Sequence, residues 1–163
     1  MILRKLVPND APLMLEWMHD PSVVEHLGTN FAEKTMDDCL RFIDWANNTD
    51  TDLHLAVADE DDTYMGTVSL KHIDRTAKIA EFAITVRACA MGKGYSRYGM
   101  EQILEMGVHE MGLDVIYWCV NPINERAVHF YDKCGYQRTE QVPASLLELY
   151  KDLPANLIWY QYQ

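Results

Sequence analysis

Three runs of alternating apolar and polar residues lie close together in the middle of the chain, and they impose the main constraint on the fold. The runs are 53–58 (LHLAVA), 65–73 (MGTVSLKHI) and 78–86 (KIAEFAITV). Alternation with a period of two places successive side chains on opposite faces of a β-strand. Because only short turns separate the three runs, we expect them to pair as an antiparallel meander.

A helical spacing replaces this alternation after the third run. Apolar residues then recur every three or four positions from about Ser96 to Met111. Gly112 follows directly and is a typical C-terminal cap of a helix. The change of period predicts a long helix after the meander.

Capping residues mark the starts of further helices, because Asn, Asp and Thr side chains bond the free amides at a helix N-terminus. These helices are expected to begin near Asn9-Asp10, Thr35 and Asn124. In the helix that begins at Thr35, the expected inner face consists of Met36, Leu40 and Ile43.

The remaining apolar runs are read as strands, and they complete the predicted order. These strands are 1–6, 114–120, 136–142 and 156–162. The resulting order is strand, two helices, three strands, helix, strand, helix and two strands. It predicts an α/β fold with a mixed sheet, in one domain that spans residues 1–163.

The net charge of the chain limits the classes of partner that it can bind. The formal net charge is −11, which argues against nucleic acid as a partner, because nucleic-acid binding needs clustered Lys and Arg. An acidic surface attracts cationic amines, although it also simply keeps a protein in solution. No apolar window has the length of a membrane span, and the N-terminus lacks a secretory signal. We therefore expect a cytoplasmic protein that does not bind membranes.

The segment 91–96 reads MGKGYS and joins the third run to the long helix. Glycines let the backbone approach a ligand closely, and the first amides of a helix are free and partly positive. Such a turn can bind phosphate. The nineteen residues between Glu81 and Glu101 contain no acidic side chain but do contain Arg87, Lys93 and Arg97. We expect a phosphate-binding loop, and the alternative is a glycine-rich turn without a ligand.

Two common nucleotide-binding motifs do not fit this loop. A dinucleotide fingerprint requires a third glycine three residues after the second, whereas Gly99 lies two residues too late. A P-loop requires GxxxxGK followed by Ser or Thr, and the chain contains none.

A second motif, NERAVHFYDKCGY, occupies residues 124–136. Together with the loop, it resembles the GNAT superfamily of acetyl-CoA-dependent N-acetyltransferases, in which this helix often reads Asn-x-x-Ala-x-x-x-Tyr-x-Lys-x-Gly-Phe/Tyr. The matching positions are Asn124, Ala127, Tyr131, Lys133, Gly135 and Tyr136. The resemblance implies a single-domain GNAT-like fold, with a mostly antiparallel central sheet, two splayed strands and flanking helices.

The loop matches the same family in part. The family's loop reads Gln/Arg-x-x-Gly-x-Gly/Ala, and Gly94 stands at its first glycine, while Met91 and Ser96 replace the other two signature residues. The segment EWMHDPSVVEHLG is similar to the subgroup that contains ribosomal-protein N-terminal, spermidine and amino-sugar acetyltransferases. The resemblance covers residues from about 1 to 143.

By this resemblance, backbone amides of the loop would hold the pyrophosphate of acetyl-CoA. The pantetheine arm would pair with the third run, and Asn124 would bond the pantetheine, cap its helix, or do both. The implied cofactor-binding residues are Ile84, Thr85, Val86, Met91, Gly92, Lys93, Gly94, Tyr95, Ser96, Arg97 and Asn124. No metal is implied.

Two residues are the candidates for acid and base. Tyr131 matches the position that often protonates the leaving thiolate in the family, and its alternative role is that of a core aromatic. Glu81 lies in mid-strand on the face opposite Phe82, where it is either a base for the amine or a salt-bridged strand residue. Direct transfer needs no covalent enzyme intermediate, so no Ser/His/Asp grouping is expected, and the sequence suggests none.

The resemblance implies an enzyme, an N-acetyltransferase that moves an acetyl group to a primary amine. A small acceptor such as an amino sugar is the first expectation, and a polyamine or a protein N-terminus is the alternative. A non-catalytic sensor or scaffold that binds CoA is the alternative of another class. The chain is expected to act as a monomer or homodimer.

Overall fold

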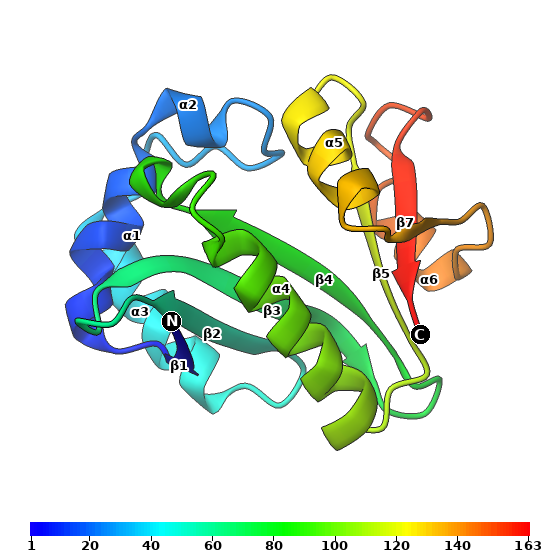
Figure 1. The fold of residues 1–163 in the computed structure, drawn as a ribbon, viewed down its shortest axis with the longest axis horizontal. Helices are drawn as coiled ribbons and strands as arrows, with labels where there is room; N and C mark the ends of the chain where they lie inside the picture. The colour runs from blue at the N-terminus through cyan, green and yellow to red at the C-terminus, as the bar shows by residue number, and fades with distance from the viewer.

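Seven strands form one mixed sheet with the order β1-β2-β3-β4-β5-β7-β6 (Figure 1). A computed structural model describes all residues from 1 to 163. The strands are β1 (Ile2–Lys5), β2 (Leu53–Ala58), β3 (Tyr64–Asp74), β4 (Ile79–Val86), β5 (Val115–Val120), β6 (Gln137–Arg138) and β7 (Ile158–Tyr162).

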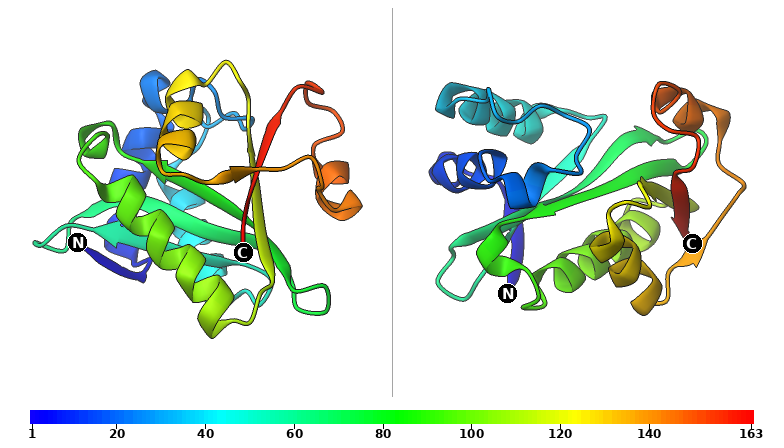
Figure 2. Two further views of the ribbon diagram at one scale, coloured as in Figure 1. Left: turned by 45° about the vertical axis from the view of Figure 1, so that its right-hand side comes forward. Right: turned by 90° about the horizontal axis from the view of Figure 1, so that it is seen from above.

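Helices cover both faces of this sheet. They are η1 (Pro8–Asp10), α1 (Ala11–Met18), α2 (Pro21–Val24), α3 (Met36–Asn48), η2 (Ala88–Ala90), α4 (Tyr95–Glu105), η3 (Met106–Glu110), α5 (Glu125–Lys133) and α6 (Ala144–Leu149). Seen from above, α1, α3 and α6 lie on one side of the sheet, and α4 and α5 lie on the other (Figure 2, right). The expected fold class, a mixed sheet with flanking helices, is confirmed.

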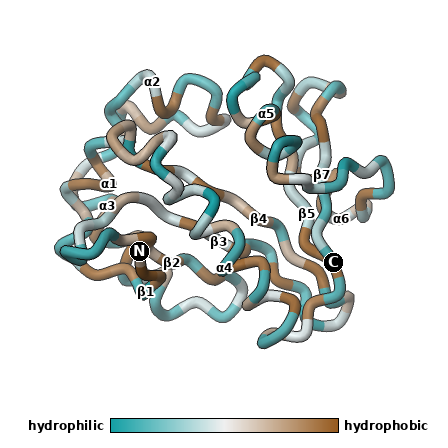
Figure 3. The backbone as a smooth tube through the Cα atoms, in the orientation of Figure 1, coloured by the Kyte–Doolittle hydropathy of each residue, from teal (hydrophilic) through white to brown (hydrophobic).

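The meander expected from the alternating runs is present. Strands β1 to β4 pair in sequence order and antiparallel. Hydrophobic residues recur along these strands, while the hydrophilic turn 59–62 joins β2 to β3 (Figure 3). The next neighbour, β5, runs parallel to β4, because α4 carries the chain back across the sheet before β5 begins.

Each face of the sheet has its own core. The larger cluster packs α4 and α5 onto the central strands, and its fully buried members include Val68, Ile103 and Trp118. The second cluster packs α1 and α3 onto β2 and β3, around Met14 and Ile43. Helices on both faces explain why buried residues occur at both alternating sets of positions in the central strands, as at Leu55 to Ala58 of β2.

The C-terminal part differs from the sequence prediction. The strand expected at 136–142 is only the two-residue β6, and an unexpected helix, α6, follows it. The last strand, β7, enters the sheet between β5 and β6. No helix combines the length and apolarity that crossing a bilayer would require.

The predicted inner face of α3 is also partly wrong. Ile43 is buried as expected, but Met36 and Leu40 are exposed, and the buried positions are instead Cys39, Ile43 and Ala46. Cys39 and Ala46 are small, which allows α3 to lie close against α1 and the sheet.

Candidate functional site

The parallel pair β4 and β5 is joined over only part of its length. Pairing runs from Ile79↔Val115 to Glu81↔Tyr117 and then stops. From 82 to 86, β4 keeps its pairing with β3 but has none with β5, and beyond Tyr117 the only partner of β5 is β7. The backbone edge of β4 is therefore open at Ile84, Thr85 and Val86, where the family resemblance would place the pantetheine arm.

The loop after β4 presents free amides at the start of α4. Gly92 and Gly94 have φ values of +74° and +89°, which favour glycine because a Cβ is strained there. Tyr98 is the first residue whose amide bonds back, to the carbonyl of Gly94 at 3.0 Å. The amides of Tyr95, Ser96 and Arg97 thus have no intrahelical partner and can meet an anion.

The basic side chains around this loop differ in whether they already form ion pairs within the protein. Arg87 forms a paired contact with Glu16 (Nε–Oε1 2.9 Å, Nη2–Oε2 3.0 Å), and Arg97 pairs with Glu101 (Nε–Oε1 2.8 Å). Lys93 is exposed and forms no ion pair. Arg126, which sequence reasoning did not single out, brings Nη1 to 2.6 Å from the sulfur of Met91. Its position at the start of α5 adds a cation to the side of the loop.

Asn124 caps the N-terminus of α5, which is one of the two roles expected for it from the sequence. Its side-chain oxygen accepts a hydrogen bond from the amide of Ala127 at 3.3 Å. Its side-chain nitrogen forms no hydrogen bond within the protein. The cap therefore leaves a donor free, and the cofactor contact predicted for Asn124 stays a prediction.

Tyr131 lies in an aromatic cluster next to the open edge of β4. Its ring contacts Trp118 with centroids 5.6 Å apart, and Trp118 in turn meets Phe82 on β4 at 5.5 Å. The residue is only 8% exposed, and its hydroxyl makes no hydrogen bond. Burial raises the pKa of the Tyr131 hydroxyl, so the phenol stays protonated at neutral pH.

Glu81 is almost fully buried, at 2% exposed, on the opposite face of the sheet. One carboxylate oxygen accepts a hydrogen bond from the hydroxyl of Tyr150, just after α6. The other, Oε1, lies 3.4 Å from the Lys71 ammonium and 3.7 Å from Nε2 of His72, yet has no hydrogen-bond donor. At 3.4 Å the Lys71 contact is an ion pair with imperfect hydrogen-bond geometry, so Glu81 is both salt-bridged and incompletely satisfied.

A cavity of about 270 Å³ opens on the same face as Glu81, between the sheet and α1, α3 and the segment between α2 and α3. Its walls are largely apolar and aromatic, with Trp17, Phe31 and Phe42 among them. Its floor includes Ala83 to Thr85 of β4, the stretch whose backbone edge is open toward β5. Glu81 itself does not line this cavity.

A hydrogen-bonded Asp–His–Ser series, which sequence reasoning did not find, ends in this cavity. Nδ1 of His54 lies 2.6 Å from Oγ of Ser69, and Nε2 lies 3.1 Å from Oδ2 of Asp52. The expectation that no such grouping exists was therefore wrong. Ser69 lies in β3, His54 is the second residue of β2 and Asp52 directly precedes β2, and only the strand register His54↔Ser69 brings Ser69 to the other two.

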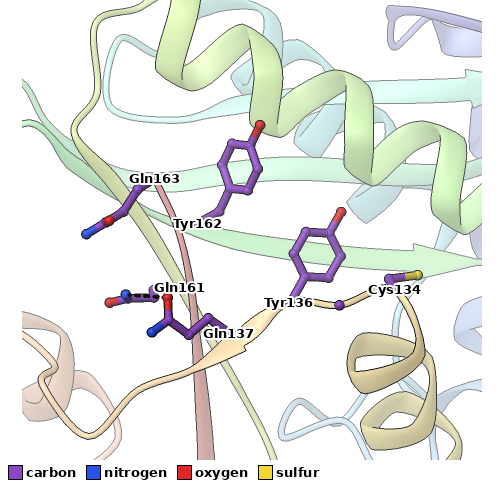
Figure 4. Close-up of a pocket in the computed structure, with 7 residues that line it drawn as sticks. Cys134, Tyr136, Gln137, Gln161, Tyr162 and Gln163 are labelled. Carbon is purple, nitrogen blue, oxygen red and sulfur yellow. Dashed lines mark hydrogen bonds between the residues drawn. The ribbon is translucent and has the colours of Figure 1, made fainter.

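A second cavity, of about 450 Å³, lies at the other end of the sheet. It is lined by residues that follow α5 and by the end of β7, with Tyr136 and Tyr162 pointing toward α4 and three glutamine side chains nearby (Figure 4). It contains none of the residues predicted for the site. No cluster of His, Cys, Asp and Glu side chains has a metal-binding arrangement.

Comparison with known proteins agrees with this geometry. Spermidine N(1)-acetyltransferase of Vibrio cholerae is 32% identical over 80 residues, 49% of this chain and 46% of that protein, so the similarity spans less than half of the relative. A crystal structure of the Vibrio cholerae spermidine N-acetyltransferase in complex with CoA and spermine has a TM-score of 0.81, at 19% identity, over 99% of this chain and 94% of that chain.

A dodecameric structure of the same Vibrio cholerae enzyme has a TM-score of 0.74, at 20% identity, over 99% of this chain and 92% of that chain. At these identities the structural matches establish the fold. The acetyltransferase (GNAT) domain family matches residues 1–137, which is most of the chain. The split between β4 and β5, the amide-rich loop and the aligned family domain together show that the chain belongs to the GNAT acetyltransferase family.

Proposed function

We propose that this protein is an N-acetyltransferase that moves the acetyl group of acetyl-CoA directly to a primary amine of a polyamine-like acceptor. One observation carries the proposal. The β4 segment Ala83 to Thr85 borders the acceptor-sized cavity on one face of the sheet and, at the same time, has its backbone edge open toward β5. A donor along that edge and an amine in the cavity would meet at one strand.

The residues present fit acetyl-CoA. The amides of Tyr95, Ser96 and Arg97, with Lys93 and Arg126 beside them, would hold the diphosphate. The open edge at Ile84 to Val86 would pair with the amide-containing pantetheine arm, as a strand would. The thioester, when bound, supplies the acetyl group. Met91, Gly92, Gly94 and Asn124 belong to the proposed site as loop and cap residues.

Tyr131 is the proposed acid. Its protonated hydroxyl has no partner in the protein, and the cluster around it reaches β4 through Trp118 and Phe82. A phenol in this state can give its proton to a leaving thiolate and recover one from the amide nitrogen as product forms. Glu81 contributes negative charge on the acceptor side of the sheet in this proposal. The more specific role predicted from the sequence is that Glu81 is the base that takes the proton of the amine.

The acceptor class follows from the cavity and from the relatives. The relatives named above act on or bind spermidine and spermine, and the net charge of −11 favours approach of a polycation. Trp17, Phe31 and Phe42 suit the apolar methylene segments of a polyamine, and aromatic faces also attract ammonium groups. An amino sugar, with hydroxyls on most carbons, has fewer apolar groups to place there.

The test is release of free CoA thiol from acetyl-CoA across a panel of amines: spermidine, spermine, glucosamine and a short peptide with a free N-terminus. We expect kcat/KM to be highest for the polyamines. Transfer to glucosamine or to the peptide alone would contradict the acceptor class. Acetyl-CoA binding without thiol release for every amine would instead support the non-catalytic sensor.

The assembly and the compartment complete the proposal. We expect a monomer or homodimer in the cytoplasm, where the four free cysteines would stay reduced. Because a relative with the same fold forms a dodecamer, light scattering with and without spermine is the direct check of the assembly.

A further inference from the structure

The series Asp52–His54–Ser69 connects the cavity with the protein surface. Ser69 and His54 are each only 6% exposed, and both line the cavity. Asp52 does not line it, and its side chain is 12% exposed at the outer end of the series. Its second oxygen, Oδ1, accepts a hydrogen bond from the backbone amide of His72 at 3.1 Å, which fixes the carboxylate.

The carboxylate sets the tautomer of the imidazole. An ionised Asp52 can only accept, so Nε2 of His54 carries the hydrogen. In the neutral ring, Nδ1 is then an acceptor, and the Ser69 hydroxyl must donate to it across 2.6 Å. This leaves the lone pairs of Ser69 Oγ free to accept a hydrogen bond in the cavity.

The surroundings keep the imidazole neutral and in place. Rings of Phe42 and Trp45 on α3 lie 5.0 and 5.5 Å from it, between centroids. Burial lowers the pKa of His54, Asp52 partly offsets this, and Lys71 on β3 lowers the pKa further. A neutral imidazole in a proton-accepting tautomer is what a general base at neutral pH requires.

Comparison with a neighbouring hydroxyl shows that Ser69 differs in the group to which it is hydrogen-bonded. Thr67, two residues earlier on β3, also lines the cavity, and its Oγ1 lies 2.6 Å from the hydroxyl of Tyr64. Tyr64 accepts in turn from the indole nitrogen of Trp17 at 3.0 Å. That series contains no group that takes up a proton near neutral pH, whereas the series behind Ser69 does.

We propose that Ser69, His54 and Asp52 form a relay that removes the proton from the acceptor ammonium in the cavity. The inference rests on the proposed function. The ammonium N–H bond breaks and its proton goes to Ser69 Oγ, as the Ser69 proton passes to Nδ1 of His54. The resulting imidazolium is paired with Asp52, and once the product has left it returns the Nδ1 proton through Ser69 to water in the emptied cavity, which restores the starting tautomer. The amine, now neutral, uses its lone pair to attack the acetyl carbon.

Variants of the relay make this testable. His54→Gln and Ser69→Ala are compared with wild type by kcat/KM for spermidine from pH 5 to 9, with His109→Gln as a control. His109 is an exposed imidazole next to Glu105, away from the cavity. At neutral pH we expect His54→Gln to lose about 100-fold, at the lower end of the usual range for a general base, and Ser69→Ala to lose at least about tenfold, since it keeps the imidazole.

The pH profile distinguishes a relay from a merely structural role. Wild type should level off above the lowered pKa of His54, whereas His54→Gln should keep rising with pH, because it depends on amine already neutral in solution. Acetyl-CoA affinity should stay unchanged in Ser69→Ala, while the unfolding temperature should fall, because Nδ1 of His54 loses its buried hydrogen-bond partner.

Three other outcomes would decide against the relay. If both variants keep the wild-type profile, the relay is wrong while the transferase stands. If Glu81→Gln loses the acid limb and His54→Gln does not, Glu81 is the base and the relay is overturned. If wild type binds acetyl-CoA but releases no thiol with any amine, the proposed function is wrong, and the relay, which depends on it, is wrong as well.

Discussion

Tyr131 is a core residue, and its proposed role is that of an acid. Aromatic rings from Trp118, Phe130 and Tyr160 lie 5.2 to 5.6 Å from its ring. Such packing fixes the direction of the hydroxyl, and burial keeps the proton on it. The hydroxyl itself has no partner, so the packing that holds the ring leaves its reactive atom free.

Tyr131→Phe removes that atom and retains the ring. We expect kcat to fall by about 100-fold with little change in acetyl-CoA affinity, since only proton transfer to the thiolate is lost. Stopped-flow thiol release and calorimetric titration measure the two quantities.

The matched control is Tyr136→Phe, which deletes a hydroxyl from the same aromatic cluster, 5.2 Å from Trp118 between ring centroids. It should leave kcat unchanged. Equal losses in the two variants would assign the effect to packing and would contradict the acid role of Tyr131.

At the scale of elements, the position of α4 depends on Gly99. A Cβ on this residue would lie 2.6 Å from Cγ2 of Val57 and 2.9 Å from Cγ1 of Val68, which is closer than real contacts allow. The missing side chain lets α4 rest directly on β2 and β3. The same contact sets the direction in which the first amides of α4 point.

Gly99→Ala should therefore lower the free energy of unfolding by about 1–3 kcal/mol, the usual cost of overpacking a core. Urea denaturation measures this change. Gly28→Ala is the control, because a Cβ there meets no atom within 4 Å. Equal stability of the two variants would show that α4 can shift without cost.

Periodicity and capping in the sequence predict most elements, because both are local properties. Thr35 and Asp38 form the expected capping box, and Gly112 and Gly135 have the positive φ of helix ends. The inner face of α3 was predicted in part, because small residues such as Cys39 bring a helix close without adding to an apolar stripe. α6 and the place of β7 were missed, since both depend on long-range contacts.

The candidate site likewise contains residues that local sequence patterns reveal and residues that only long-range contacts bring together. The loop and Tyr131 belong to motifs through which the sequence resembles the family, so they could be named as candidates from the sequence. The Asp52–His54–Ser69 series could not, because residues 54 and 69 meet only through the register of β2 with β3. An alternating strand shows that His54 and Ser69 each face one side of the sheet, but the turn geometry decides whether they are opposite each other.

At the scale of the whole molecule, the net charge of −11 would act on the proposed cationic acceptor before it reached the cavity. Attraction of this kind is long-ranged and falls with ionic strength, since the screening length drops from about 10 Å at 0.1 M salt to about 3 Å at 1 M. Its effect grows with the charge of the ligand.

KM for spermidine should therefore rise several-fold between about 0.1 M and about 1 M potassium chloride. Steady-state kinetics with a monoamine of similar length provides the comparison, and its KM should rise much less. An identical salt response for both amines would show that the overall charge plays no part in capture of the acceptor.

The place of β7 in the sheet also governs how this protein is made. The β1–β4 meander can form on the ribosome as soon as Val86 has emerged, whereas β5 beyond Tyr117 has no neighbour but β7. Until β7 is synthesised, the part of β5 beyond Tyr117 lacks a sheet partner and is open to wrong pairing. The β5 side of the split, where the proposed donor site lies, is thus completed last, when the strand that ends at Tyr162 has joined the sheet.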